Sequence, residues 1–491
     1  MESDEREDHL FWFDGDGLDE EPQVVFFNVQ EPLPEDLSEY WRAREVLLRS
    51  SGYLLLHILD GIITFVSFVG RSFLHASDLH LGFPLGELKD CDQLSEDDLK
   101  KLVKDMQRAF DNLIQLAITN NVLFVVLAGD IYDDSDSQDA LQADFREGML
   151  KLEKFGIKVY IIHGNHDPLK KGYKPRRPLP DNVYVFETEA PHEFIAAESD
   201  EGMVCVAGIS FATSEVKENL TEGFKNLPRE NARWRVGVLH TSMAGNSAHD
   251  PYAPCSIEDL RDAPVGYWAL GHIHLRNDNN SLGDSRWWAY SGNLQGRNFK
   301  PSECHAKGAL LVTLNHYGFD APKFAACDTV RFVNVLVDIS EIEEIEKCKA
   351  LICEKVSEIS ESQDGRRLVV RVTLDGRSDF HKEIRTLVDS GKMWTDFIKD
   401  YAVEIGDTIV AGIVSTVRPI RDMNQLREGD SLIATTLRLL DEMSDEKIVS
   451  EASKLVVSAA SECLGVEDAK TIREETVMAL VEAILEDQPD S

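Results

Sequence analysis

The chain has 491 residues, of which 43% are hydrophobic and 28% charged, the composition of a globular protein with about two to four domains. Lysine and arginine number 51 against 88 aspartates and glutamates, so the formal net charge is -37. This charge excludes a broad electrostatic attraction to nucleic acid, and any contact with a polyanion has to be local.

The first part of the chain, residues 1–70, is predicted to be an acidic extension with one apolar segment. Residues 1–40 hold fourteen acidic side chains against the single Arg6, a composition typical of disorder or of a solvated extension. Residues 53–70 are apolar, but His57 and Asp60 interrupt them, and an aspartate at the centre of a membrane helix costs about 2.5–3.5 kcal/mol. We therefore interpret this segment as a buried strand and expect no membrane span.

The cysteines and the N-terminal residues indicate a cytoplasmic protein. Eight cysteines are scattered without a CxxC pair or a zinc-ligand spacing, as is typical of reduced thiols. The opening residues, MESDEREDHL, lack the positive charge and the apolar run of a signal peptide.

Residues 71–328 are predicted to form an α/β domain, because short apolar strands that end in polar clusters alternate with helices. The first strands are FLHAS, VLFVVLA and VYIIH, and we expect helices over residues 96–119 and 140–155 between them. The later strands have fewer helices between them, so the sheet should become mixed. Residues 329–491 have the pattern of a smaller α+β domain that ends in amphipathic helices.

Polar residues follow five of the strands directly, and they are the candidate chemistry of the chain. Carboxyl ends of strands in an α/β sheet are where ligand sites form, because side chains from several loops converge there. Taken singly, each polar residue is more often a turn residue or a core histidine, but their joint occurrence predicts a metal site. The candidates are Asp78, His80, Asp130, Asn165, His166, His240, His272 and His274.

The donor atoms of this set are oxygen and nitrogen, without a thiolate. Such donors suit Mn2+, with Fe2+ or Mg2+ as alternatives, better than a structural zinc ion. The set is too large for one ion and fits two if one carboxylate bridges them, an arrangement that stabilises both the attacking and the leaving oxygen in a displacement at phosphorus. The glycines that precede Asp130, Asn165 and His272 would let the chain turn tightly at the site.

The motifs DLHLG, GDIYD, GNHD and GHIH, with His240 at a strand end, resemble those of the calcineurin-like metallophosphoesterase superfamily. The DLHLG form and the segment SGNLQGR, residues 291–297, resemble its DNA-repair nuclease branch of the SbcD and YhaO type, and residues 368–384 are similar to the YhaO-type C-terminal module. The resemblance implies a two-sheet sandwich flanked by helices, an α/β/β/α fold, over residues 71–328. It also implies a smaller α+β C-terminal domain, over residues 329–491, that caps the site or binds DNA or a partner.

The resemblance also implies a role for each candidate residue. His166 would be catalytic, since beside Asn165 it can reach the phosphate and donate a proton to the leaving oxygen. Asp133 stands where some nuclease relatives have a histidine, so we assign it to supporting the ligands or fixing the loop instead of gripping phosphate. One ion would be held by Asp78, His80, Asp130 and His274, and the other by Asp130, Asn165, His240 and His272, with Asp130 as the bridge.

A basic segment follows the GNHD motif and is the clearest candidate for contact with DNA. Residues 170–177 hold five cations and no acid, and Tyr173 among them could stack on a base. The alternative is a solvated loop tip. The tentative DNA contacts are Lys170, Lys171, Tyr173, Lys174, Arg176, Arg177 and Arg297.

These observations favour a two-metal-dependent DNA nuclease that acts as an exonuclease, with single-strand endonuclease cleavage as a second mode. The resemblance implies that it works in DNA repair or anti-phage defence with an SbcC- or YhaN-like ABC ATPase. By the same analogy, helix 96–119 would help to form a homodimer. The terminal helices would bind the ATPase or, as an alternative, pack among themselves. Two other functions stay open: a metallophosphoesterase acting on a nucleotide or phosphoprotein, and a non-catalytic regulatory subunit of the same fold.

Overall fold

The structure, a computed structural model, describes residues 68–82, 96–133, 139–169, 178–199, 201–228, 232–243, 252–363, 365–420, 426–428, 431–444 and 447. These residues divide into two compact units. The first holds the described residues up to Val335 together with Ile352–Thr373 and Asp396–Ile413. The second holds Leu336–Leu351, Leu374–Thr395 and the described residues from Val414 onward.

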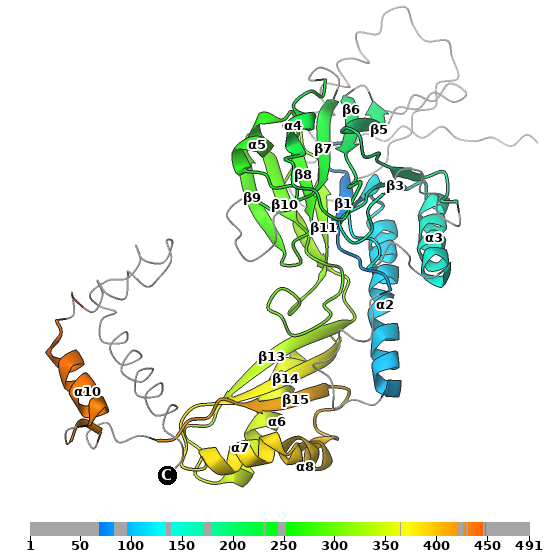
Figure 1. The fold of residues 1–491 in the computed structure, drawn as a ribbon. Helices are drawn as coiled ribbons and strands as arrows, with labels where there is room; N and C mark the ends of the chain where they lie inside the picture. Colours follow the sequence, from blue (N-terminus) through cyan, green and yellow to red (C-terminus); the bar gives the residue numbers. More distant parts are fainter. Residues whose placement is uncertain are drawn as a thin grey trace, which may run out of the picture. The chain divides into compact units, whose positions relative to one another are not determined.

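Six strands form the first sheet, in the order β12-β11-β1-β2-β3-β4. Its strands β1, β3 and β11 are labelled in Figure 1. The strands β1 to β4 run parallel, whereas β11 and β12 join antiparallel at one side. Parallel neighbours need a crossover, which α2 (Glu96–Thr119) and α3 (Asp139–Lys154) supply, so the carboxyl ends of β1, β2 and β3 meet at one edge. The bounds are β1 Ser72–Ala76, β2 Phe124–Ala128, β3 Lys158–Ile162, β4 Val183–Val185, β11 Gly308–Thr313 and β12 Lys323–Ala326.

The second sheet also has six strands, in the order β5-β6-β7-β8-β10-β9. Its four inner strands are parallel and its two edge strands antiparallel, so this sheet is mixed like the first. The bounds are β5 His192–Ser199, β6 Gly202–Gly208, β7 Ala232–His240, β8 Tyr267–Gly271, β9 Asn277–Gly283 and β10 Arg286–Tyr290.

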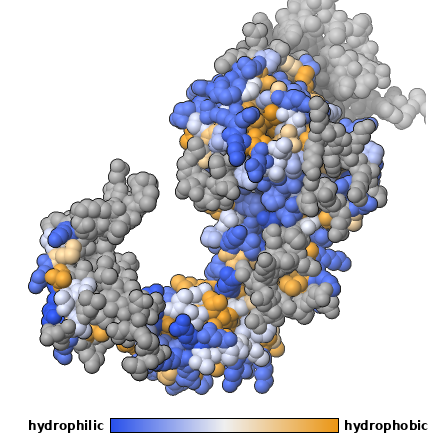
Figure 2. All heavy atoms as spheres, in the orientation of Figure 1, coloured by the Kyte–Doolittle hydropathy of each residue, from blue (hydrophilic) through white to orange (hydrophobic). Residues whose placement is uncertain are grey.

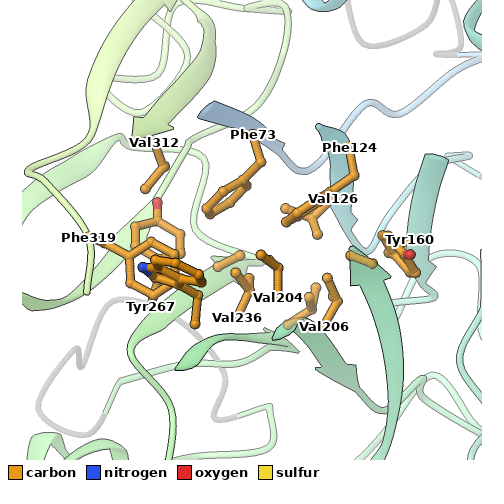
Figure 3. Packing of buried hydrophobic residues seen from close by; sticks show 14 of the residues in the cluster. Phe73, Phe124, Val126, Tyr160, Val204, Val206, Val236, Tyr267, Val312 and Phe319 are labelled. Atoms are coloured by element: carbon orange, nitrogen blue, oxygen red, sulfur yellow. The ribbon is translucent and has the colours of Figure 1, made fainter. Parts of the chain in front are cut away.

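The hydrophobic core lies between the two sheets. Phe73, Val126 and Tyr160 of the first sheet pack with Val236 and Tyr267 of the second (Figure 3). Because side chains alternate along a strand, the residues next to them face the other way, toward a helical layer.

Helices cover the outer face of each sheet. Leu74 and Val125 of the first sheet share a cluster with residues of α2 and α3, such as Leu113. On the second sheet Trp268 packs with Leu260 of α5 (Ile257–Asp262) and with α4 (Thr221–Phe224). The predicted α/β/β/α sandwich is therefore confirmed, and the helix expected over residues 96–119 has these bounds.

A third sheet follows, with the strand order β13-β14-β15. With its helices it confirms the smaller α+β part of the predicted fold, while the domain boundaries at residues 70 and 328 stay predictions. The bounds are β13 Val330–Asp338, α6 Ile345–Glu361, β14 Arg367–Asp375, α7 His381–Asp389, α8 Lys392–Tyr401, β15 Ile409–Ser415 and α10 Leu432–Glu442.

Among the described residues, no helix has the length and apolar character to cross a membrane. Of the predicted apolar strand over residues 53–70, the part up to residue 67 lies outside the described residues, and Phe68 is buried in the core between the sheets. The face shown in Figure 2 carries mostly hydrophilic residues with smaller hydrophobic patches between them.

One buried histidine links the two sheets. His75 of β1 is fully buried, with its Nδ1 3.0 Å from the Tyr267 hydroxyl and its Nε2 3.2 Å from the Leu270 carbonyl oxygen. Burial lowers the pKa of His75 from 6.5 to about 3, although the Leu270 carbonyl and the charge of Asp78 oppose the shift. The ring is therefore neutral in the folded protein.

This shift predicts a loss of stability in acid. Below pH 6.5 the unfolded chain takes up a proton at His75 that the folded chain does not bind until about pH 3. The free energy of unfolding should therefore fall, by up to about 1.4 kcal/mol per pH unit, as the pH drops through this window. In urea denaturation, His75→Gln should be less stable near neutral pH but show a flatter pH dependence. His316→Gln, at an exposed ring, is the control, and equal slopes in wild type and His75→Gln would contradict the prediction.

Candidate metal centre

The predicted ligands all lie at one place, where the two sheets bring their strand ends together. Asp78 and His80 follow β1, Asp130 follows β2 and Asn165 follows β3. The second sheet contributes His240, the last residue of β7, and His272 and His274 after β8. Asp78, His80, Asp130 and His240 are buried, whereas His166 is exposed beside them.

The donor atoms are spaced as around metal ions. The Nε2 atom of His240 lies 3.4 Å from Asp130 Oδ2 and 3.0 Å from Asn165 Oδ1. The Nε2 atom of His274 lies 3.8 Å from Asp78 Oδ1 and 3.1 Å from His80 Nε2. Ligands about 2.1 Å from an ion are about 3.0 Å apart in an octahedron and about 3.4 Å apart in a tetrahedron, so these separations fit shared ions.

The direction of the histidine rings gives a second, independent indication of a cation. The Nδ1 atom of His80 faces Asp133 Oδ1 at 2.8 Å, and that of His274 faces Glu303 Oε1 at 2.5 Å. A carboxylate only accepts hydrogen bonds, so each Nδ1 carries the proton and each Nε2 presents a lone pair. These two lone pairs face each other, an arrangement that requires a cation or a shared proton between them.

His240 is oriented in the same way. Its Nδ1 donates to the Ala128 carbonyl oxygen at 2.9 Å, which turns Nε2 toward the oxygen atoms of Asp130 and Asn165. His272 instead presents Nδ1, 3.1 Å from Asn165 Oδ1. The donors that converge thus fit the two divalent ions expected from the sequence, and the assignment of each ligand stays a proposal.

The backbone at the site is strained. Four of the seven predicted ligands have a positive φ: Asp78 at 50°, His80 at 44°, Asp130 at 49° and His272 at 95°. Non-glycine residues rarely adopt this conformation, and such strain is common at functional sites. Here the strand-end loops hold it in place, because Asp78 N donates to the Gly129 carbonyl oxygen at 3.0 Å and His80 N to that of Asp130 at 3.0 Å.

The glycines of the motifs are needed mainly for close approach. A Cβ atom at Gly271 would lie 1.9 Å from the Ala128 carbonyl oxygen, and one at Gly164 would lie 2.3 Å from Asp130 Oδ1. Only Gly129, at φ 93°, also uses the positive φ that a tight turn suggests. The tight turn expected from the sequence therefore accounts for one of the three glycines. The other two are needed because a Cβ atom would have no room there.

Asp167, for which sequence reasoning found no role, ties two metal loops together. It is buried, and its carboxylate accepts from the backbone N–H of Ile131 at 2.9 Å and from that of Gly164 at 2.9 Å. The loops after β2 and β3 are thereby joined next to Asp130. Its place in the GNHD motif was the only signal in the sequence.

His166 lies at the open side of the site. Its backbone N–H donates to Asp130 Oδ1 at 2.9 Å, and its ring centre is 4.8 Å from that of His80. Its Nδ1 lies 3.2 Å from the Asp133 carbonyl oxygen, which leaves Nε2 as the outer nitrogen. The predicted proton donor is thus exposed beside the ligands.

Arg297, expected to contact DNA, and Glu303, which sequence reasoning missed, lie behind the ligands. Arg297 is only 9% exposed, and its guanidinium contacts Asp133 Oδ1 at 3.0 Å and Glu303 Oε1 at 3.6 Å. Asp133 contacts the His80 ring at 2.8 Å, and both its supporting role and the DNA contact of Arg297 stay predictions. The basic residues 170–177 lie outside the described residues.

Charges at the site favour bound cations. Burial alone would raise the pKa of the Asp130 carboxyl, but the charge and hydrogen bond of His240 and the charges of His80 and His166 hold it well below its usual range. Burial lowers the pKa of His80, and burial together with the charge of His240 lowers that of His272 to about 3, so these two imidazoles stay neutral, as metal ligands must be. Burial opposes protonation of His240 as well, but the charge and hydrogen bond of Asp130 raise its pKa to about 9, so a cation that binds here would displace a proton from this ring.

Comparisons with known proteins agree with these observations. Residues 71–276 match the family of calcineurin-like phosphoesterases, and residues 332–417 match the middle domain of the metallophosphoesterase YhaO. The chain is 28% identical over 305 residues to the uncharacterized metallophosphoesterase YhaO of Bacillus subtilis, covering 62% of this chain and 72% of that protein.

Two archaeal proteins named DNA double-strand break repair protein Mre11 are also similar. The chain is 27% identical over 207 residues to that of Thermoplasma acidophilum, covering 41% of this chain and 51% of the relative. It is 26% identical over 296 residues to that of Methanocaldococcus jannaschii, covering 56% of this chain and 74% of the relative. The match thus spans about half the length of the Thermoplasma protein.

The close approach at Gly271 predicts a sensitive position. Gly271→Ala should lower the free energy of unfolding by about 1–3 kcal/mol or more, because the added methyl group would push the end of β8 away from β2. It should also weaken metal binding, since His272 is the next residue. In urea denaturation the control is Gly412→Ala, where an added Cβ meets no atom within 4 Å and the change should be small. Equal stability of Gly271→Ala and wild type would contradict the prediction.

Proposed function

We propose that this chain, which carries a calcineurin-like metallophosphoesterase domain and a YhaO-type middle domain, is a metal-dependent nuclease that hydrolyses phosphodiester bonds of DNA. The observation that carries the proposal is the pair of facing imidazole nitrogens, His80 Nε2 and His274 Nε2, which lie 3.1 Å apart beside the carboxyl groups of Asp130 and Asp78. Such a group of donors has little use except to bind cations.

Two divalent ions are the proposed cofactors, with Mn2+ first and Mg2+ or Fe2+ as alternatives, because all donors are oxygen and nitrogen. When bound, the ions would supply positive charge to the attacking and leaving oxygens of a displacement at phosphorus. One would be held by Asp78, His80, Asp130 and His274, and the other by Asp130, Asn165, His240 and His272.

Asp130 and His166 would each have a further role in the reaction. Asp130 suits the bridging position, since its Oδ2 lies 3.4 Å from His240 Nε2 and 3.8 Å from His80 Nε2, one ligand of each ion. His166 is exposed, with its ring centre 4.8 Å from that of His80, so it would donate a proton to the leaving oxygen.

Two observations favour DNA over a nucleotide or a phosphoprotein as substrate. The similar archaeal proteins are named for DNA double-strand break repair, and the basic residues 170–177 follow directly on the GNHD motif. The complete donor set argues against a non-catalytic regulatory subunit, which would have no use for it.

The setting of this activity is part of the proposal. We expect a cytoplasmic complex with an SbcC- or YhaN-like ABC ATPase, which acts in DNA repair or in antiviral defence. A homodimer through α2 would need a polar interface, because Lys104, Gln107 and Arg108 are exposed on that helix.

Cleavage assays test the activity. With Mn2+, the purified protein should cleave end-labelled single- or double-stranded DNA, and Asp130→Ala should abolish cleavage while the circular dichroism spectrum stays unchanged. His166→Ala should keep its metal and lose about 10²–10⁴-fold in kcat, the usual contribution of a general acid. A small chromogenic phosphodiester is assayed in parallel, and its hydrolysis without any cleavage of DNA would overturn the nuclease proposal.

The basic segment predicts how binding responds to salt. Reversing Lys170, Lys171 and Lys174 to glutamate should weaken DNA binding and flatten its salt dependence, by about 0.9 log units of slope for each duplex phosphate that the protein no longer neutralises. The matched control reverses Lys151, Lys217 and Lys323, which lie elsewhere in the same domain. An unchanged slope in the first variant would mean that the segment is a solvated loop.

A further inference from the structure

A chain of buried and half-buried charges runs behind one half of the metal centre. It consists of Glu303, Arg297 and Asp133, and it contacts two proposed ligands, His274 and His80. We propose that Glu303 and Arg297 are positioning residues that preform the site of Asp78, His80 and His274, so that this site binds its ion before and more tightly than the other. The inference rests on the proposed metal-dependent function and deepens it.

The first step concerns the histidines. Glu303 Oε1 lies 2.5 Å from His274 Nδ1, and Asp133 Oδ1 lies 2.8 Å from His80 Nδ1. A carboxylate partner on the far nitrogen fixes the tautomer and the ring direction of a metal-binding histidine and raises its basicity. Both histidines of this site are thus directed at the ion position before an ion arrives.

The second step concerns the carboxylates, which are themselves held. Glu303 is 3% exposed, and its Oε2 accepts from the Asn293 side-chain amide at 2.8 Å and from the backbone N–H of Arg297 at 3.1 Å. The Arg297 guanidinium lies 3.0 Å from Asp133 Oδ1 and 3.6 Å from Glu303 Oε1. One guanidinium therefore joins the two carboxylates that orient the two histidines.

The third step is the contrast with the other site. There the Nδ1 atom of His240 donates to the Ala128 carbonyl oxygen, a neutral partner. The neutral amide of Asn165 takes the place that the carboxylate of Asp78 has in the first site. With less charge and weaker support, the site of Asn165, His240 and His272 should fill second.

A titration of Mn2+ into the metal-free, full-length protein tests the inference, with free Mn2+ measured by electron paramagnetic resonance. Wild type should bind two ions in two steps. Glu303→Gln keeps the size of the side chain but loses its charge, and should weaken the tighter step about 10–100-fold, the usual effect of removing such a partner. Asn165→Ala should weaken only the looser step.

A matched control separates this effect from a general loss of charge. Glu193→Gln changes a residue of the edge strand β5 that is not among the proposed ligands or their partners, and it removes the carboxylate that pairs with the buried Arg235 of β7. This variant should bind Mn2+ like wild type. If Glu303→Gln does not fold, Arg297→Lys takes its place as the test variant. Lysine keeps the positive charge but lacks the planar guanidinium that reaches both carboxylates. It should weaken the tighter step by a smaller factor.

The outcomes separate this inference from the proposed function. Unchanged binding in Glu303→Gln, or in Arg297→Lys if that variant decides, would overturn the inference even if the protein cleaves DNA. A wild type that binds no Mn2+ or binds two ions with equal affinity would overturn it as well. A weakened first step without DNA cleavage would support the inference and count against the nuclease.

Discussion

The pair of imidazole nitrogens in His80 and His274, 3.1 Å apart with their lone pairs facing, makes the strongest physical demand on this fold. Neither nitrogen can turn away, because the other nitrogen of each ring faces a carboxylate, that of Asp133 or that of Glu303. The arrangement is favourable only with positive charge between the rings. Much of the surrounding structure, from the strained strand-end loops to the glycines that let the sheets approach, serves to hold these donors together.

The acidic residues behind the net charge of -37 are distributed unevenly along the chain. Part of the acidity belongs to carboxylates such as Asp78 and Asp130, which divalent ions would neutralise. Fourteen of the acidic residues lie within residues 1–40, outside the described part of the chain. An acidic protein can thus act on a polyanion if ions and a short basic segment supply the local attraction and a partner supplies the remaining affinity.

Much of the fold and of the site could be predicted without the structure. α2 has the predicted bounds, and α3 lies within one residue of them, because amphipathic periodicity is a local signal. The superfamily was recognised from motifs such as GNHD and GHIH, in which each ligand directly follows an apolar strand, and the comparisons confirm it. What the local pattern could not show were contacts between residues far apart in the chain. The guanidinium of Arg297, which is predicted to contact DNA, lies against two carboxylates, those of Asp133 and Glu303.

The order of residues along the chain was enough to specify the strands, the helices and the set of donors, since these depend on near neighbours. It could not specify which nitrogen of each histidine is free to bind. His274 owes its orientation to Glu303, 29 residues away, and His80 to Asp133, 53 residues away. Such pairs depend on where the folded chain returns to itself, and no local pattern encodes that. The sequence therefore predicted which residues carry the candidate donor atoms. Tertiary packing determined which way these atoms point, and with it the proposed difference in affinity between the two ion sites.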